Sequence, residues 1–187
     1  MNIEKQILEL FVDAAGRALV AKVIAFARER HGDQPREGGE LHVEHVLRVG
    51  LACGQYAQTD CPEDLLTLVL AGICHDLKED TGTTLAEISE LCGAEVARIV
   101  HALSHEYEEE SDVVYLARVA TAGRLAVVVK RHDKLDNLRS LASASANFRE
   151  RKIAETRAAL VIWAKMDPDA VPLFEEALYE LPRSSPL

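Results

Sequence analysis

Apolar residues recur every three or four positions along most of the chain, which is the spacing of one face of an α-helix. Val20, Val23 and Ile24 show it within residues 3–30, where Gly16 is expected to mark a break between two helices. The same pattern predicts further helices at 42–57, from Pro62 to about His75, and at 84–92, 94–104, 149–165 and 169–181.

The remaining segments are read from their composition. Residues 31–40 are rich in Gly, Pro and charge and are expected to form a loop, and the acidic run 106–112 a solvated loop or helix start. Residues 127–129 are β-branched valines, but no convincing second strand could pair with them, so 113–140 is predicted to be a buried helix. The tail 182–187 is expected to be frayed.

No repeat or linker interrupts these elements, so the chain is predicted to be one all-α domain spanning residues 1–187. With 187 residues, of which 48% are hydrophobic, a core can form without disulfides. The net charge of −10 argues against a nucleic-acid or anionic-membrane partner, because both need a basic surface. A small anionic substrate stays possible, since a metal ion and a few local cations can reverse the sign within a cleft.

The four cysteines form no C-x-x-C pair, so a structural zinc site is not expected. The N-terminus lacks the features of a signal peptide, and no apolar stretch approaches the roughly 20 residues needed to span a bilayer. We therefore expect a cytoplasmic protein with free thiols.

Metal-type ligands occur in three separate segments. They are His45, the pair His75-Asp76 at the end of an apolar helix, and Asp133. Two imidazoles and two carboxylates suit manganese, iron or zinc and are too rich in nitrogen for calcium. An isolated His-Asp pair is usually only a helix end with a solvated carboxylate. Here an apolar helix runs directly into the pair, and a metal would compensate for its burial.

Glu79 and Asp80 follow the His-Asp pair within five residues. An acidic pair is usually a solvated turn. Beside a metal site, however, these carboxylates could orient water or carry its proton. We therefore expect both to be catalytic.

The helix around Asp133 places Lys130, Asp133 and Asn137 on one face, because they are spaced by three and four residues. Lys130 and Asn137 are expected to face an anionic substrate or to support the ligand, the alternative being intrahelical ion pairs of small effect. His132 and Asp136 are predicted to lie on other faces and not to bind metal, with Asp136 as the alternative to Asp133 for the ligand.

The other histidines give weaker signals. His31 is expected to support the site or bind substrate, and His42 could lie near it, three residues before His45. His101 and His105 have a metal-type i, i+4 spacing but no accompanying carboxylate motif, so structural or solvent-facing roles are expected for them.

Four segments together resemble the HD hydrolase superfamily, and within it the (p)ppGpp hydrolase domains of the RelA/SpoT type and their small stand-alone homologues. The resemblance spans about residues 20–142. It is carried by HGDQPREGGELHVEH (31–45), HDLKEDT (75–81), the segment TLAEISELCGAEVARIV (84–100) and VKRHDKLDNLR (129–139).

This resemblance implies an HD-type helical bundle with a central metal site, followed here by the predicted helices in 149–181. It also implies that His45, His75, Asp76 and Asp133 hold manganese, with iron, zinc, magnesium, cobalt and nickel as alternatives. The Glu79-Asp80 pair would assist water attack in removing the 3′-pyrophosphate of a guanosine nucleotide. Arg36 would lie against the base and Asn137 near the ribose or 3′-phosphate.

Some positions depart from the family pattern. A family Lys is Glu37 here, the family's Pro-Tyr is Leu41-His42, and a Pro is Val46. These departures leave the metal ligands intact but bear on the nucleotide pocket.

Three hypotheses follow: a hydrolase of (p)ppGpp or a related nucleotide, an HD phosphatase of another nucleotide or phosphomonoester, and a metal- or nucleotide-binding sensor without turnover. The intact Glu79-Asp80 pair disfavours the sensor.

Overall fold

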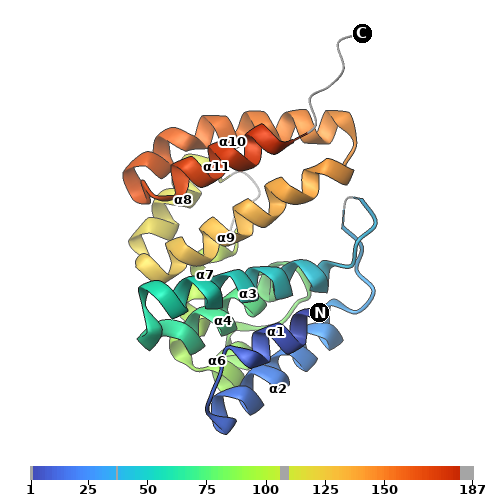
Figure 1. Ribbon diagram of the computed structural model, residues 1–187, viewed down its shortest axis with the longest axis vertical. Helices are drawn as coiled ribbons and strands as arrows, with labels where there is room; N and C mark the ends of the chain where they lie inside the picture. Colours follow the sequence, from blue (N-terminus) through green and yellow to red (C-terminus); the bar gives the residue numbers. More distant parts are fainter. Residues whose placement is uncertain (1, 37, 106–109, 182–187) are drawn as a thin grey trace.

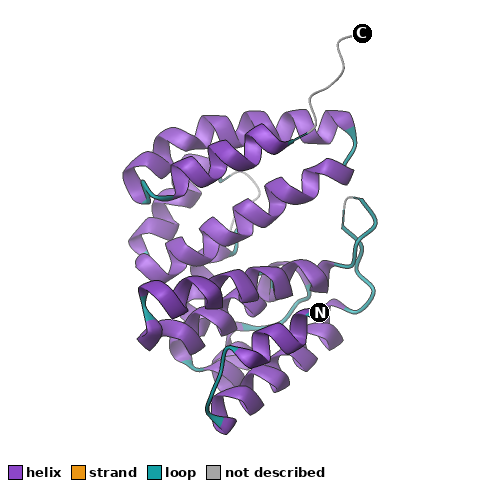
Figure 2. Cartoon of the chain, viewed as in Figure 1, coloured by secondary structure: helices purple, strands orange, loops and turns teal. Residues whose placement is uncertain are grey.

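The structure, a computed structural model, describes residues 2–36, 38–105 and 110–181. Within these ranges the chain is helical without strands, apart from one isolated bridge between Pro35 and Leu41 (Figure 2). The predicted all-α fold class is therefore confirmed.

The helices follow one another along the chain with short connections. They are α1 (Ile3–Glu9), α2 (Ala14–His31), α3 (His42–Asp60), η1 (Pro62–Asp64), α4 (Leu65–Cys74), α5 (Leu77–Asp80), α6 (Leu85–Cys92), α7 (Ala94–Leu103), α8 (Asp112–Thr121), α9 (Arg124–Ser140), η2 (Leu141–Ser143), α10 (Ala146–Met166) and α11 (Ala170–Glu180).

Helix α9 lies at the centre of the bundle (Figure 1). On one side it packs against α3, α4 and α7, and on the other against α8, α10 and α11. Helices α1, α2 and α6 complete the half that contains α3 and α4. Polar residues on α9 are thus placed between the two halves of the fold.

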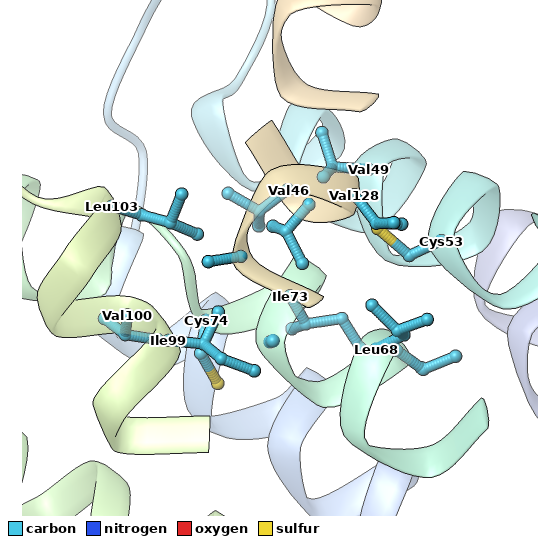
Figure 3. Close-up of a cluster of buried hydrophobic side chains, with 14 of the residues drawn as sticks. Val46, Val49, Cys53, Leu68, Ile73, Cys74, Ile99, Val100, Leu103 and Val128 are labelled. Atoms are coloured by element: carbon cyan, nitrogen blue, oxygen red, sulfur yellow. The ribbon is translucent and has the colours of Figure 1, made fainter. Parts of the chain in front are cut away.

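The hydrophobic core joins the helices that later supply the polar site. Val46 of α3, Ile73 of α4, Val100 of α7 and Val128 of α9 meet in one buried cluster (Figure 3). Residues 127–129 are buried in α9, as the prediction of a buried helix required. Burial of these side chains, each worth roughly 1.5–3 kcal/mol, fixes the relative positions of the four helices.

Glycines allow α3 and α4 to approach closely. A Cβ added to Gly72 would lie 2.8 Å from the Cα of Gly50, nearer than real Cβ contacts occur. Gly50 is five residues after His45 and Gly72 is three residues before His75. The close crossing therefore brings these two histidines toward each other.

Three details differ from the sequence predictions. Gly16 does not mark the first break: it lies in the first turn of α2, where its N–H donates to Asp13 at 2.6 Å, and the break falls at residues 10–13. The predicted helix over 113–140 is two helices, divided at Gly123, whose φ of +104° suits glycine. The short helix α5 was not predicted as an element.

Some predictions concern residues outside the described ranges. They are the predictions for Glu37, for the tail 182–187 and for residues 106–109 of the acidic run. In the part of the chain that the structure describes, none of the helices combines the length and apolar character that crossing a membrane requires.

Candidate metal centre

The four predicted metal ligands come together where three helices meet. His45 lies in the first turn of α3, His75 and Asp76 link α4 to α5, and Asp133 lies in the middle of α9. Both histidines are 2% exposed and Asp133 is 4% exposed. Such burial of ionisable groups requires strong compensation.

Their donor atoms lie close to one another. His45 Nε2 is 3.3 Å from Asp133 Oδ1 and 3.6 Å from Asp76 Oδ2. His75 Nε2 is 3.1 Å from Asp76 Oδ1 and 3.6 Å from Asp133 Oδ1. His45, His75 and Asp133 offer donor atoms close enough together to hold a divalent ion, which binds such ligands at about 2.0–2.2 Å, and the Asp76 carboxylate borders this group.

The second ring nitrogen of each histidine fixes its tautomer. His45 Nδ1–H donates to Asp136 Oδ2 at 2.7 Å, and His75 Nδ1–H donates to the Gly72 carbonyl at 2.8 Å. When the rings are neutral, each Nε2 therefore presents a lone pair toward the carboxylates. Among the described residues, His75 Nε2 is buried without a hydrogen-bond partner. A divalent metal ion fits this orphaned donor and the carboxylates around it.

The electrostatics of the centre also favour a cation. Burial lowers the pKa of His75, but the charges of Asp76 and Asp133 outweigh it and raise that pKa to about 10. Burial raises the pKa of Asp133, but Lys130, His45 and His75 hold it well below its usual range. A proton on His75 thus occupies the place that a metal would take, so metal binding should release protons.

Lys130 and Asn137 both support Asp133. Lys130 Nζ lies 2.7 Å from Asp133 Oδ2 and 4.9 Å from the centre of the Tyr115 ring. The Asn137 side-chain amide donates to Asp133 Oδ1 at 2.5 Å. These contacts match the predicted shared face of the helix and place the Lys130 ammonium against the ligand. Substrate contact by Lys130 stays a prediction.

Asp136 does not lie on another face of the helix, contrary to the sequence analysis. Its carboxylate accepts from His45 Nδ1 and, at 2.7 and 3.0 Å, from the Arg48 guanidinium. Burial raises its pKa, but these hydrogen bonds prevail and lower it to about 2. A spacing of three residues from Asp133 was the signal that could have identified it. Asp136 is the residue that orients His45.

We expect Asp136→Asn to weaken metal binding by about 10- to 100-fold, the usual effect of losing such a supporting carboxylate. Manganese titration of the metal-free protein measures this. The same substitution also weakens the contact with Arg48. Glu40→Gln is the matched control, because Glu40 pairs with Arg48 without touching His45. Equal metal affinity in Asp136→Asn and wild type would contradict the orienting role.

Glu79 and Asp80 lie on α5, at the edge of the centre. Glu79 Oε2 accepts from the backbone N–H of His105 at 3.2 Å. Asp80 Oδ2 lies 3.2 Å from His42 Nε2. Burial and the nearby Asp76 charge raise the pKa of Asp80. Their positions beside the ligands are compatible with the predicted catalytic role, which stays a prediction.

His42 and His31 extend the centre toward the loop after α2. His42 Nε2 is 2.8 Å from Asp76 Oδ2. The His31 ring stacks on His42 with 4.8 Å between ring centres, and its Nδ1 pairs with Gln34 at 3.0 Å. His42 therefore belongs to the site more closely than its sequence position alone indicated.

The three remaining histidines do not belong to the groups of donor atoms that, among the described residues, could hold an ion. His101 is exposed on α7, and the His105 ring stacks on Tyr115 while its backbone N–H contacts Glu79. The His132 ring lies 5.9 Å from that of Tyr56, and burial lowers its pKa to about 3. These positions agree with the roles expected for them.

A cavity of about 300 Å³ borders the metal centre between the loop 32–41, α9, η2 and α10. Arg36 and Asn137 line it, and Arg36 donates to the Asn137 side-chain oxygen. The complete lining consists of Arg36, His42, Lys134, Asn137, Leu138, Ser140, Leu141, Ala144, Phe148, Lys152 and Thr156.

Two cations of this cavity were missed by the sequence analysis. Lys134 makes no ion pair among the described residues, and burial together with Lys130 lowers its pKa. Lys152 comes from α10, where it pairs with Glu155 at 2.7 Å. Lys134 and Lys152 together give the cavity a basic wall, although the chain as a whole is acidic.

Comparison with curated proteins finds relatives by sequence, although no family model matches the chain. It is 32% identical over 128 residues, 65% of its length, to the guanosine-3′,5′-bis(diphosphate) 3′-pyrophosphohydrolase of Aquifex aeolicus, of which it covers 18%. It is 30% identical over 78% of its length to a probable GTP pyrophosphokinase of Mycobacterium leprae, of which it covers 19%. The chain thus spans about a fifth of the length of these relatives.

A solved structure shares the fold over nearly the whole chain. It is described as "A metazoan ortholog of SpoT hydrolyzes ppGpp and plays a role in starvation responses". The TM-score is 0.71 with 19% sequence identity, and the match covers 87% of this chain and 95% of the other. At 19% sequence identity, the match shows that the two proteins share a fold.

Proposed function

Because this chain is related to the HD-type hydrolase domains of RelA/SpoT proteins, we propose that it is a divalent-metal phosphohydrolase acting on a nucleotide such as (p)ppGpp. The metal would be manganese, held by His45, His75, Asp76 and Asp133. The enzyme would be cytoplasmic and act on a small anionic substrate, and the net charge of −10 disfavours a nucleic-acid partner.

One observation carries this proposal: Asn137 belongs both to the metal centre and to the basic cavity. Its amide supports the ligand Asp133, and its side-chain oxygen accepts from Arg36, which lines the cavity. A phosphate group held by Arg36 and Lys134 would therefore lie next to the metal ligands. The relatives named as pyrophosphohydrolases support the same reaction class.

The rest of the cavity favours a nucleotide over inorganic phosphate. Leu138, Leu141, Ala144 and Phe148 add an apolar part to the lining, beside the cations. An apolar wall with a few convergent polar groups is typical of small-molecule sites. Here it offers space for a base or ribose.

The proposed reaction breaks a phosphorus–oxygen bond with water. The water oxygen bonds to phosphorus, one water proton goes to a carboxylate, and the leaving oxygen takes up a proton. Glu79 would accept the water proton, and Asp80, whose pKa is raised by burial and by Asp76, would carry protons beside it. A divalent ion bound here supplies polarisation of the phosphoryl oxygen and lowers the pKa of water.

A nucleotide other than (p)ppGpp is the second candidate. The observation behind it is His42, which lines the cavity where the family pattern has Tyr. An imidazole offers less apolar stacking area than a phenol ring and a different hydrogen-bond pattern. The choice of substrate therefore depends on a direct comparison.

We expect the purified protein to hydrolyse ppGpp in the presence of manganese. A panel assay with ppGpp, other nucleotides and a simple phosphomonoester would measure the release of pyrophosphate and phosphate. Chelation with EDTA should abolish turnover and manganese should restore it. Turnover of another panel member alone would favour the second candidate. Absence of turnover on the whole panel, with manganese bound, would contradict the proposed activity and favour a sensor.

A further inference from the structure

Two of the four cysteines lie side by side, although they are 18 positions apart in the sequence. Cys74 ends α4 and Cys92 ends α6, and their Sγ atoms are 3.9 Å apart. Cys74 is fully buried and belongs to the core cluster of Figure 3, whereas Cys92 is partly exposed. A small molecule in solution therefore reaches this thiol pair from the Cys92 side.

Cys92 has the features of a reactive thiol. Reactive cysteines are partly exposed and lie near a cation, whereas fully buried cysteines are inert. The contact with Cys74 and the charge of Lys22 on α2 lower the pKa of the Cys92 thiol, although burial opposes them. The other two cysteines, Cys53 and Cys61, are both buried. Cys92 is thus the thiol that an oxidant meets first.

The end of α6 is free enough to let the two sulfur atoms meet. A disulfide requires them to approach by about 2 Å, because the bond is roughly 2.05 Å long. Within α6, which the structure describes in full, Ile88 alone is buried. Gly93 follows with a φ of +92°, and a side chain built there would meet open space. Cys92 thus lies on a lightly anchored helix end that can move toward α4.

We propose that a hydroperoxide joins Cys74 and Cys92 in a reversible disulfide, and that this bond weakens metal binding at the adjacent centre. The disulfide itself follows from the thiol pair and is independent of the proposed function. Its effect on metal binding rests on the proposed function, because it requires the metal centre described above. Oxidation would then switch the phosphohydrolase off, and reduction would restore it.

The reaction consumes one hydroperoxide and two thiols. The Cys92 thiolate attacks the terminal peroxide oxygen, the O–O bond breaks, and the leaving alkoxide takes up the thiol proton to become an alcohol. The Cys74 sulfur then attacks the sulfenic acid at Cys92, the S–O bond breaks, and the oxygen leaves as water with the Cys74 proton. Two electrons pass from the sulfur atoms to the hydroperoxide. A small thiol reverses the reaction by exchange through a mixed disulfide.

The path from the thiol pair to the metal centre is one peptide bond long. Cys74 directly precedes His75, whose Nδ1–H donates to the Gly72 carbonyl at 2.8 Å. Hence the last turn of α4 holds both the sulfur and the ligand ring. Tightening the contact between Cys74 and Cys92 pulls on this turn, and a ligand has to stay within about 0.5 Å of its place to bind well. The disulfide therefore lowers the affinity for a divalent ion.

The experiment begins with metal-free protein that has been reduced with dithiothreitol and desalted. It is treated with hydrogen peroxide, the remaining thiols are blocked with iodoacetamide in denaturant, and tryptic peptides are analysed by mass spectrometry without reductant. Trypsin cuts after Arg48, Lys78 and Arg98, so the expected disulfide links peptide 49–78 to peptide 79–98. Fragmentation of the linked pair should identify Cys74 as the cysteine used in the first peptide.

Manganese titration compares the reduced, oxidised and re-reduced forms. We expect binding to be about tenfold weaker after oxidation and to be restored by dithiothreitol. Cys92→Ser should form no linked peptide and keep its manganese affinity in peroxide. In Cys74→Ala, oxidation of Cys92 should stop at the sulfenic acid, which dimedone traps. Cys61→Ser is the matched control, because Cys61 is a buried thiol outside the pair and its loss should leave both effects unchanged.

The other outcomes overturn one or both parts of the proposal. Absence of the linked peptide in wild type would overturn the disulfide, as would a link through Cys53 or Cys61. A linked peptide with unchanged manganese affinity would overturn the effect on the metal centre, as would an equal loss of affinity in peroxide-treated Cys92→Ser. Reduced wild type that binds no manganese would contradict the proposed metal centre, while the peptide masses still decide on the disulfide. Circular dichroism verifies that each variant is folded.

Discussion

Asp133→Ala is expected to leave the protein without its divalent ion in the proposed centre and without phosphohydrolase activity. The substitution removes an oxygen that lies 3.3 Å from His45 Nε2 and 3.6 Å from His75 Nε2. It also leaves the Lys130 ammonium buried without its partner, which typically costs about 3–5 kcal/mol of stability. Manganese content, turnover and the free energy of unfolding measure the three effects.

The stability loss could by itself explain a loss of activity, so a second variant is needed. In Lys130→Met/Asp133→Ala the buried cation is removed together with its partner, which often restores stability. We expect this double variant to fold while still lacking the ion of the centre and activity. Lys130→Met alone is the matched control for the lysine. A folded double variant with wild-type metal content and turnover would contradict the role of Asp133.

The metal ligands could be predicted from sequence because each lies in a short, strongly patterned segment. His75-Asp76 follows an unbroken apolar helix, and Asp133 lies within a motif of eleven residues, 129–139. Helical periodicity wrongly placed Asp136 on another face, although Asp133 and Asp136 lie three residues apart and both contact His45. What separates them is the partner that each meets: His45 presents Nε2 to Asp133 and Nδ1 to Asp136.

The substrate side of the site could not be predicted equally well. Lys152 and Phe148 belong to α10, which lies beyond the motifs and is brought to the cavity by its packing against α8, α9 and α11. Lys134 follows a ligand in the motif, but its lack of an acidic partner among the described residues depends on the surrounding fold. Such contacts between distant segments leave no local signal in one sequence.

The helical breaks show the same limit on a smaller scale. Gly123 was overlooked because the apolar pattern continues on both sides of it, from α8 into α9. Gly16 was given too much weight because a glycine near a helix start is as compatible with the first turn as with a break. The carboxylate of Asp13, which accepts from the Gly16 N–H at 2.6 Å, decides the start of α2.

Glu79→Gln is expected to lower kcat by about 10²- to 10⁴-fold, the usual contribution of a general base, without loss of bound manganese. The proposed role requires the negative charge, which glutamine lacks. Glutamine retains an oxygen that can accept from the His105 backbone N–H, so the local contact can persist. Steady-state kinetics on the panel substrate with the highest turnover, together with metal analysis, measure both expectations.

Glu90→Gln provides the matched control for Glu79→Gln. Glu90 is exposed on α6, so the same change of charge there should leave kcat within about twofold. Unchanged turnover in Glu79→Gln would show that another group takes the water proton. Loss of metal from folded Glu79→Gln would instead assign Glu79 to holding the ion. A low kcat with wild-type metal content and an unchanged KM would place its effect in the chemical step, as the proposed mechanism requires.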